Sequence, residues 1–281
     1  MEAINKLYTF AVFYISITLK ALIILINKGM KKISCLMALA FVSVMVFTSC
    51  RPSVIFSHVG GNTLEPSNKI ITKNYTDLDF QSVDFSSVGS VEFVQTQGGK
   101  CSVSITAPDN YVPIYIVKVE KGTLKIYNED GYNLKDADVK IIISGPTLKS
   151  IDNSGVGKIK IASLNTTSLD IDNSGVGKIK IDSLEAAAVK VDNSGVGSVD
   201  LKGKASKVSL DCSGVGSIDA AKLHAVIVNA DVSGVGGVKC YASEEISGDV
   251  SGVGSLKYAG HPAKKHLNSN DVVGKIEEIN E

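Results

Sequence analysis

The chain has 281 residues with 29 basic and 29 acidic side chains, so its formal net charge is zero. This balance argues against a general electrostatic partner such as nucleic acid, and none is predicted. The absence of tryptophan and the 26 glycines favour a regular, thin-cored β protein over an enzyme with an aromatic-lined pocket.

The first 50 residues predict an export signal that ends in a lipid-modified cysteine. A basic start at residues 30–32 precedes an apolar stretch at 33–47, which is too short for a comfortable membrane span. The sequence FTSC at 47–50 resembles a bacterial lipobox, so residues 30–49 are the expected signal peptide and Cys50 the expected lipid-attachment site. A transmembrane anchor with an incidental cysteine is the alternative interpretation.

Residues 1–29 fit this export signal poorly. They hold a second apolar stretch between Tyr8 and Ile26, and two hydrophobic segments in tandem serve no purpose before a lipobox. We therefore expect translation to start at Met30 and residues 1–29 not to belong to the natural precursor. Residues 50–74 contain Pro, Ser, Asn and Gly and are expected to be a polar tether between membrane and domain.

The remaining cysteines predict neither a disulfide framework nor a metal site. Cys101, Cys212 and Cys240 are odd in number and form no CxxC or Cys/His spacing. Together with the signal, this usage fits an exported protein that does not rely on disulfides. The expected location is the outer membrane, to which the lipid would bind the protein on the periplasmic or the outer face.

The segment at 84–130 differs from the repeats that follow it. The sequence DFSSVGSVEF at 84–93 is expected to be a degenerate first rung of a repeat structure. Residues 100–130 alternate between apolar and polar and predict longer strands with hairpins. We expect them to form an N-terminal cap, because solenoids need caps to block edge-to-edge aggregation.

A repeat of Asp-x-Ser-Gly-Val-Gly occupies much of the second half of the chain. The form DNSGVGKIKI occurs at 152–161 and again at 172–181. The copies are separated by 20, 20, 19, 20 and 18 residues and begin at Asp152, Asp172, Asp192, Asp211, Asp231 and Asp249. A period near 20 predicts a solenoid in which each copy forms one rung. One rung cannot bury enough apolar surface to offset its own ordering cost, so the rungs must stack.

The alternation within a repeat predicts which side chains face inward. Strand geometry places Leu169, Ile171 and Asn173 on one face and the intervening aspartates on the other. The inward slot that holds Asn173 is filled in successive copies by Asn153, Asn173, Asn193, Cys212, Val232 and Val250. A slot that accepts cysteine and valine is buried, so the three asparagines are expected to form an internal amide ladder.

Each rung is predicted to contain a strand, a glycine corner, a second strand and a shorter third face. The third face carries Leu164, Leu184 and Leu223, and the changes in repeat length are expected between this face and the next aspartate. The glycines are expected to adopt backbone conformations that a side chain would penalise. The residues assigned to the structural repeat are Asp152, Asn153, Gly155, Gly157, Asp172, Asn173, Gly175, Gly177, Asp192, Asn193, Gly195 and Gly197.

The repeated aspartates are predicted to point outward, one above another. Carboxylates stacked ~4.8 Å apart repel each other, so their charge requires relief. A ladder of bound calcium ions is one hypothesis; the other is that each aspartate caps its corner through local backbone groups. No other cofactor and no catalytic residue is predicted.

The sequence resembles the head GIN domain family, whose members are described as auto-transporter adhesins of Bacteroidetes-type bacteria. The resemblance covers about residues 76–260 and includes VEFVQTQGGKCSVSITAPDNYVP, VEKGTLKIYNED, VKIIISGPTLKSIDNSGVGKI and DVSGVGSLKYAGHP. It implies an all-β fold, a right-handed parallel β-solenoid, here expected over residues 75–268 with a tail at 269–281. Many members look like lipoproteins. Surface-exported lipoproteins of these bacteria often carry acidic residues after the cysteine, whereas residues 51–54 here read RPSV.

Three functions are compatible with these features. The favoured one is a non-enzymatic, lipid-anchored adhesin or binding scaffold for an envelope or host glycan or protein. Its stripe of outward side chains comprises Lys158/Lys160, Lys178/Lys180, Ser198/Asp200 and Ser217/Asp219. A polysaccharide lyase or hydrolase is the second, by analogy of fold alone, with His224 and Asp219 as a conceivable pair. The third is a structural envelope component that self-associates through the solenoid ends.

Overall fold

A computed structural model describes residues 62–135, 138–269 and 274–280 of this chain. The expectations for residues 1–29, the signal peptide and Cys50 lie outside these residues, as does the first part of the tether, residues 50–61. Residues Gly60–Glu281 form one compact unit that contains the whole described core. Among the described residues, no helix has the length and apolar character needed to cross a membrane.

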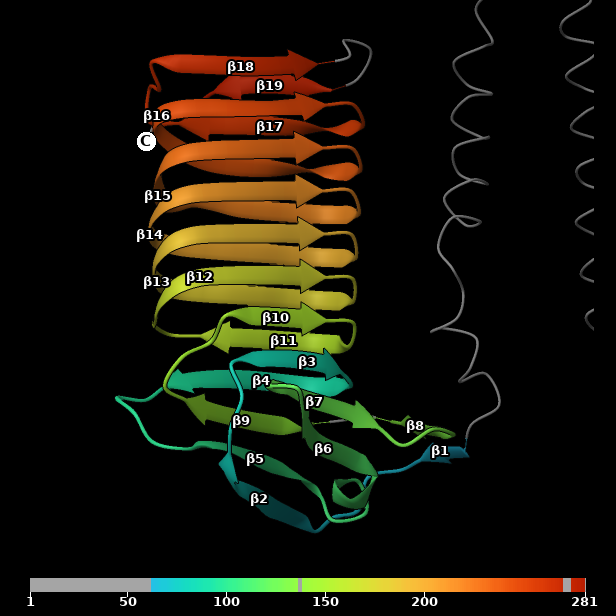
Figure 1. Ribbon diagram of the computed structural model, residues 1–281. Coiled ribbons are helices and arrows are strands. Elements are labelled where there is room, and N and C mark those ends of the chain that lie inside the picture. Colours follow the sequence, from blue (N-terminus) through green and yellow to red (C-terminus); the bar gives the residue numbers. More distant parts are fainter. Residues whose placement is uncertain (1–61, 136–137, 270–273, 281) are drawn as a thin grey trace, which may run out of the picture. The chain divides into compact units, whose positions relative to one another are not determined.

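The repeats form a parallel β-solenoid in which each copy stacks on the preceding one (Figure 1). From Val176 to Val250, one continuous strand runs around each rung from one glycine corner to the next. The strands are β10 (Ser150–Asn153), β11 (Val156–Ile161), β12 (Leu164–Asn173), β13 (Val176–Asn193), β14 (Val196–Cys212), β15 (Val215–Val232), β16 (Val235–Val250) and β17 (Val253–Ala259). The solenoid with rungs of roughly 20 residues is therefore confirmed.

The core consists of the side chains that the alternation predicts to point inward. Leu169, Ile171, Ile179 and Ile181 are all buried, and their counterparts in the other rungs continue the same interior. Identical residues lie in register across the rungs, as in the pairing of Ile159 with Ile179. Because each rung covers its neighbour's apolar face, the core is continuous along the axis.

Inside the solenoid the three asparagines form a hydrogen-bonded ladder. Asn153 Nδ2 donates to Asn173 Oδ1, and Asn173 Nδ2 donates to Asn193 Oδ1, each at 2.7 Å. The amide groups at the two ends, Asn153 Oδ1 and Asn193 Nδ2, are buried and have no hydrogen-bond partner. Phe85 lies below the ladder and Cys212 above it, so neither neighbour offers a strong polar group. The inward direction of all three side chains agrees with the predicted phasing.

The corner glycines are required mainly because consecutive rungs approach closely. A Cβ atom on Gly175 would lie 2.2 Å from the carbonyl oxygen of Gly155 in the rung below. Gly177 combines such a contact, 1.8 Å from the Gly157 oxygen, with a φ of +152°. The expected conformational reason thus applies at Gly177, whereas at Gly175 close backbone approach is the cause.

The changes in repeat length do not fall where the sequence predicts them, after the third face, and this prediction is wrong. Two of the four register shifts precede that face, between Ile181 and Leu184 and between Asp200 and Lys202, and a third, between Ala220 and His224, spans Leu223 of the face itself. Only the shift between Ala225 and Ile227 follows it. Residues 182–183 and their counterparts point outward, so their number can change without disturbing the core. The strand that follows the third face must keep its alternation, because its inward side chains, such as Val189 and Val191, belong to the core.

The predicted first rung and cap are both present. β3 (Ser82–Ser86) and β4 (Val88–Gln95) lie in parallel register beneath β10 and β11. Below them, β7 (Thr123–Asn128) pairs with β3 and β9 (Lys140–Gly145) with β4, so two separated segments build one more layer. β5 (Cys101–Pro108) runs antiparallel to β9 and to β2 (Ile70–Leu78), and β6 (Tyr115–Glu120) forms a hairpin with β7. These strands cover the lower end in Figure 1.

The folded unit extends beyond the boundaries expected from sequence. β1 (Asn62–Leu64) pairs with β8 (Tyr132–Leu134), and β2 begins within the segment expected to be a tether. At the other end, β18 (Lys264–Ser269) pairs with β16, and β19 (Lys275–Glu278) pairs with β17. A short 3₁₀ helix, η2 (Val112–Ile114), lies in the cap. Part of the expected tail therefore belongs to the sheet.

Candidate binding surface

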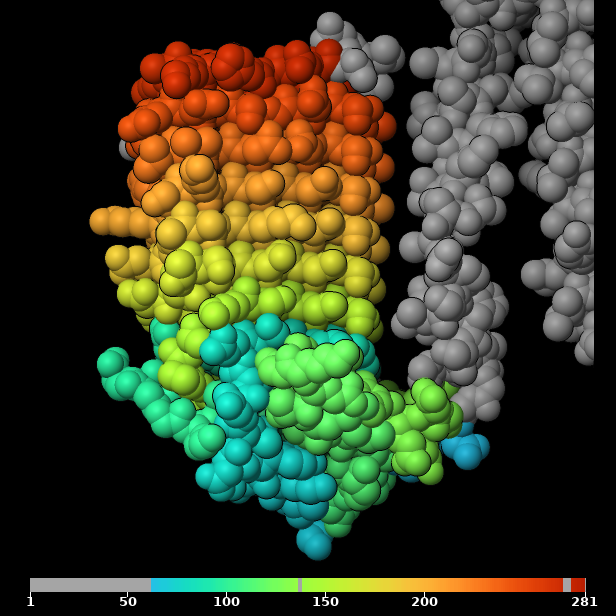
Figure 2. Space-filling view, viewed as in Figure 1, coloured from blue at the N-terminus to red at the C-terminus, as the bar shows by residue number. Residues whose placement is uncertain are grey.

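Register pairing places like residues of successive rungs in columns, and the rungs follow one another as regular layers in Figure 2. The aspartate column consists of residues that lie in register from rung to rung: Asp84, Asp152, Asp172, Asp192, Asp211 and Asp231. Burial raises the pKa of Asp152, Asp172 and Asp211, and the neighbouring carboxylates add to the rise. The carboxylates of the column therefore repel one another at neutral pH.

Local contacts relieve this repulsion at only some positions. Lys125 lies 3.3 Å from Asp84, and the Asp249 N–H donates to Asp231 Oδ1 at 3.0 Å. Asp192 Oδ1 is buried without a hydrogen-bond partner. Within the part of the chain that the structure describes, no group of three His, Cys, Asp or Glu side chains could hold a metal ion. The described residues therefore offer no coordination site that supports the calcium hypothesis.

The stripe of outward lysines predicted on the second strand is partly neutralised. Lys178 forms an ion pair with Asp200 of the next rung, and Lys180 lies 2.6 Å from Asp182. Lys158 and Lys160, at the start of the stripe, are exposed. The stripe is therefore graded, with its positive charge concentrated in the first two rungs of the repeat.

A groove crosses four consecutive rungs where the third face bends into the first strand. Its volume is about 470 Å³, and it passes over β12, β13, β14 and β15. We call it the rung groove. It is lined by Ser168, Leu169, Asp170, Ala188, Val189, Lys190, Lys207, Val208, Ser209, Ile227 and Asn229. Register pairing places Asp170, Lys190, Ser209 and Asn229 in one column, so each rung adds one polar side chain.

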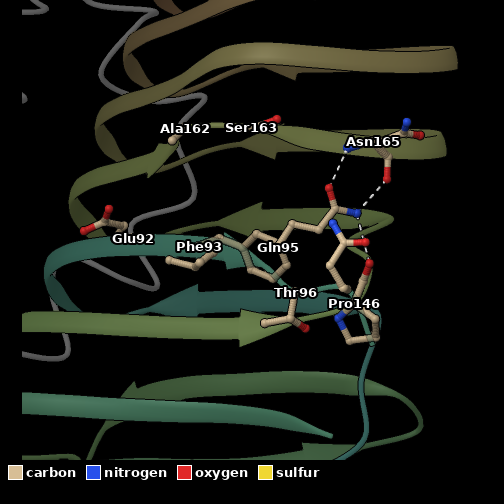
Figure 3. Close-up of a pocket in the computed structure, with 10 residues that line it drawn as sticks. Glu92, Phe93, Gln95, Thr96, Pro146, Ala162, Ser163 and Asn165 are labelled. Carbon is tan, nitrogen blue, oxygen red and sulfur yellow. Dashed lines mark hydrogen bonds between the residues drawn. The ribbon is translucent and has the colours of Figure 1, made fainter. Parts of the chain in front are cut away.

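A second hollow, of about 620 Å³, lies where the cap meets the first full rung (Figure 3). Its central residue is Gln95, whose Nε2 donates to the carbonyl oxygens of Pro146 at 2.9 Å and Asn165 at 2.8 Å. Gln95 Oε1 in turn accepts from the Asn165 N–H at 2.8 Å. The Gln95 amide thus replaces a missing backbone strand beneath the third face. Because the Gln95 amide at its centre already holds the cap and the first rung together, this hollow is mainly a structural junction.

The residues conceivable for catalysis are not brought together. His224 packs on Tyr241, with ring centroids 4.4 Å apart, while Asp219 Oδ1 accepts from the Ala221 N–H at 3.2 Å. Cys212 and Cys240 are buried, and burial raises the pKa of the Cys240 thiol to about 12. These side chains are therefore engaged in packing and in local hydrogen bonds.

Sequence reasoning missed the central valine of each Gly-Val-Gly corner. These valines point outward and are about half exposed: Val156, Val176, Val196, Val215, Val235 and Val253. We call this column the valine ridge. The signal that could have revealed it is the alternation itself, which places the residue three positions after each inward asparagine slot on the outer side of the corner.

Together these features define a capped parallel β-solenoid that presents long, repetitive side-chain columns and an axial groove. The chain belongs to the family described as "Putative auto-transporter adhesin, head GIN domain", whose model matches residues 79–262. The resemblance inferred from sequence is thereby confirmed. Membership supports a binding role of the adhesin type and a place in the cell envelope or at the cell surface.

Solved structures agree with this assignment. The crystal structure of a "putative adhesin" from Bacteroides fragilis is 38% identical, with a TM-score of 0.75 over 77% of this chain and 100% of that one. A "putative lipid binding protein" from Parabacteroides distasonis, at 19% identity and a TM-score of 0.63, covers 78% of this chain and 100% of its own. A "putative adhesin" from Parabacteroides merdae is 17% identical, with a TM-score of 0.58. The match covers 78% of this chain and 99% of that one. These last two share the fold alone. No curated protein matches the chain significantly.

Proposed function

We propose that this protein is a lipid-anchored, non-enzymatic adhesin that binds an extended glycan in the rung groove. The observation that carries the proposal is the column Asp170, Lys190, Ser209 and Asn229 along the groove. A polymer lying parallel to the solenoid axis would meet a new hydrogen-bonding side chain at every rung, ~4.8 Å apart.

The chemistry of the groove suits a neutral or weakly charged sugar chain. Carboxylate, ammonium, hydroxyl and amide groups can together donate to and accept from sugar hydroxyls. Ala188 and Ile227 occupy the neighbouring outward column and offer apolar contact to ring faces. The groove is open, so each unit of the polymer would bind weakly and the affinity would come from several consecutive units.

The glycan proposal is tested with the isolated compact unit, residues 60–281. An array of envelope and host glycans identifies a ligand, and its affinity is then measured for the double variant Lys190→Ala/Asn229→Ala. We expect at least a tenfold loss, whereas Lys160→Ala/Asn268→Ala, which alters exposed residues outside the groove, should bind normally. Equal binding by both double variants would refute the groove as the site. Binding of an envelope protein and of no glycan would refute the ligand class.

Anchoring through Cys50 rests on the lipobox-like sequence FTSC and on the basic and apolar segments before it. Mass spectrometry of the mature N-terminus is expected to find a diacyl- or triacylglyceryl modification on Cys50. The variant Cys50→Ser should leave the membrane fraction. An unmodified Cys50 in a membrane-bound protein would instead support the transmembrane alternative.

A further inference from the structure

We infer that the valine ridge is a contact surface for a second copy of this chain, with the two solenoids side by side and parallel. Apart from Ile70 and Val94, its six members are the exposed large hydrophobic residues among those the structure describes. Their exposed fractions lie between 47% and 53%. Most other large apolar side chains of the rungs face the core.

The ridge is straight and regular because the rungs stack in register. Val156 pairs with Val176, Val176 with Val196, and the pairing continues through Val235 to Val253. The ridge follows the glycine corners that join one strand to the next, which lie on the right in Figure 1. It therefore presents one apolar side chain per rung at strand spacing, ~4.8 Å.

The fold itself does not require valine at these positions. The tight corner is satisfied by the glycines on either side, and the valine side chain points away from the core. The next outward position changes freely along the same six copies, from Lys158 and Lys178 through serine to glycine. The six copies thus keep a half-exposed apolar residue at a corner whose close approach is already met by glycines, which marks the strip as an interaction surface.

A second copy of the chain is the partner that the spacing selects. Another valine ridge has the same period, so all six side chains can be covered at once without a change in either backbone. A partner with a different repeat would match at one or two rungs and then lose register. A row of valine side chains offers a partner only apolar contact, because it lacks hydrogen-bonding groups.

Charge on the two flanks decides the orientation. The aspartate column runs along one side of the ridge, and in the first two rungs of the repeat Lys158 and Lys178 lie on the other, Lys178 also forming an ion pair with Asp200. In a parallel pair, the two copies are related by a two-fold axis parallel to the solenoid axis. The aspartate column of each copy then lies next to the lysines of its partner across the contact. An antiparallel pair would place acidic beside acidic flanks. The parallel pair is therefore favoured, and each valine meets its own counterpart at the same height.

The contact is expected to be weak in dilute solution. Six half-exposed valines form a strip comparable with the few hundred Å² of a typical monomer's largest apolar patch, and smaller than the roughly 800 Å² per partner of a standard interface. Pairing should therefore appear at high protein concentration, or wherever the chains are held close together.

Sedimentation velocity of residues 60–281 tests the surface. Between about 10 μM and 1 mM, the native unit should shift from monomer towards dimer, whereas Val196→Ser/Val215→Ser should remain monomeric. Val94→Ser, which removes an equally exposed valine outside the ridge, should dimerise normally. A native unit that stays monomeric at 1 mM, or a ridge variant that dimerises normally, overturns the proposal. Binding of another envelope component to the ridge with no self-association also overturns it.

Disulfide trapping tests the orientation. Val156→Cys lies at one end of the ridge, so in a parallel pair the two introduced thiols should form a disulfide between copies under mild oxidation. The native cysteines of this unit are buried and do not compete. Ser206→Cys, on the exposed third face, is the control and should remain reduced. If Val156→Cys instead cross-links only when mixed with Val253→Cys, the pair is antiparallel and the inferred arrangement is wrong.

Discussion

The asparagine ladder offers the sharpest test of how the solenoid interior is held together. Replacing Asn173 by valine inserts a side chain that the same slot already accepts at Val232 and Val250. The substitution should therefore fit sterically. It removes both ladder hydrogen bonds, however, and leaves Asn153 Nδ2 and Asn193 Oδ1 buried without partners.

The expected cost follows from these two groups. Each buried polar group without a hydrogen-bond partner lowers the free energy of unfolding by about 1–3 kcal/mol. Burial of the valine methyl groups raises it by roughly 1–2 kcal/mol. The single variant should accordingly lose about 3 kcal/mol of unfolding free energy. The triple variant Asn153→Val/Asn173→Val/Asn193→Val leaves no such unpaired group and also removes the unpaired Asn153 Oδ1 and Asn193 Nδ2. It should be within about 1 kcal/mol of the native domain, or more stable.

The assay is chemical denaturation of residues 60–281, followed by circular dichroism, with the slope m required to stay constant. The decisive quantity is the departure from additivity, since the three single substitutions should sum to far more than the triple variant loses. If the triple variant is as destabilised as that sum, the amides contribute favourable net energy of their own, and the account of the ladder is wrong.

Four further predictions concern the corners, the aspartate column, Glu278 and the thiols. Gly175→Ala should lower the free energy of unfolding by at least about 3 kcal/mol, because its Cβ would lie 2.2 Å from the Gly155 oxygen. Val176→Ala is the control. Equal denaturation midpoints for the two variants would contradict the close approach. The raised pKa of Asp172 favours its protonated form in the folded state, so stability contributed by this group should rise as pH falls from neutral towards the unfolded value of 3.8. Asp172→Asn should therefore raise the melting temperature at pH 7 and flatten its slope with pH, and a lowered melting temperature would refute the repulsion. Glu278 acts oppositely, because its hydrogen bond from Lys265 lowers its pKa to about 2, so its stabilisation is lost as pH falls from 4.5 to about 2. Cys240, with its pKa raised to about 12 by burial, should react with thiol reagents no faster than the domain unfolds, as measured by mass spectrometry against a denatured control.

The repetitive part of this protein could be predicted from the sequence in some detail. Period, strand phase and the inward asparagine slot follow from local alternation, because each rung contacts only the copies before and after it. When neighbours in space are also neighbours in the repeat, aligning the copies is equivalent to stacking them. The pairing of Asn173 with Asn193 is an example.

The cap and the surface features depended on tertiary structure. β7 and β9 form one layer although other segments separate them, and no periodicity in residues 94–149 indicates that β5 would run antiparallel to both β2 and β9. The reason for Gly175 and the shape of the rung groove likewise arise from distances between backbones in different rungs. Such distances are set by how strands stack and bend together, and a linear pattern of side chains does not contain them.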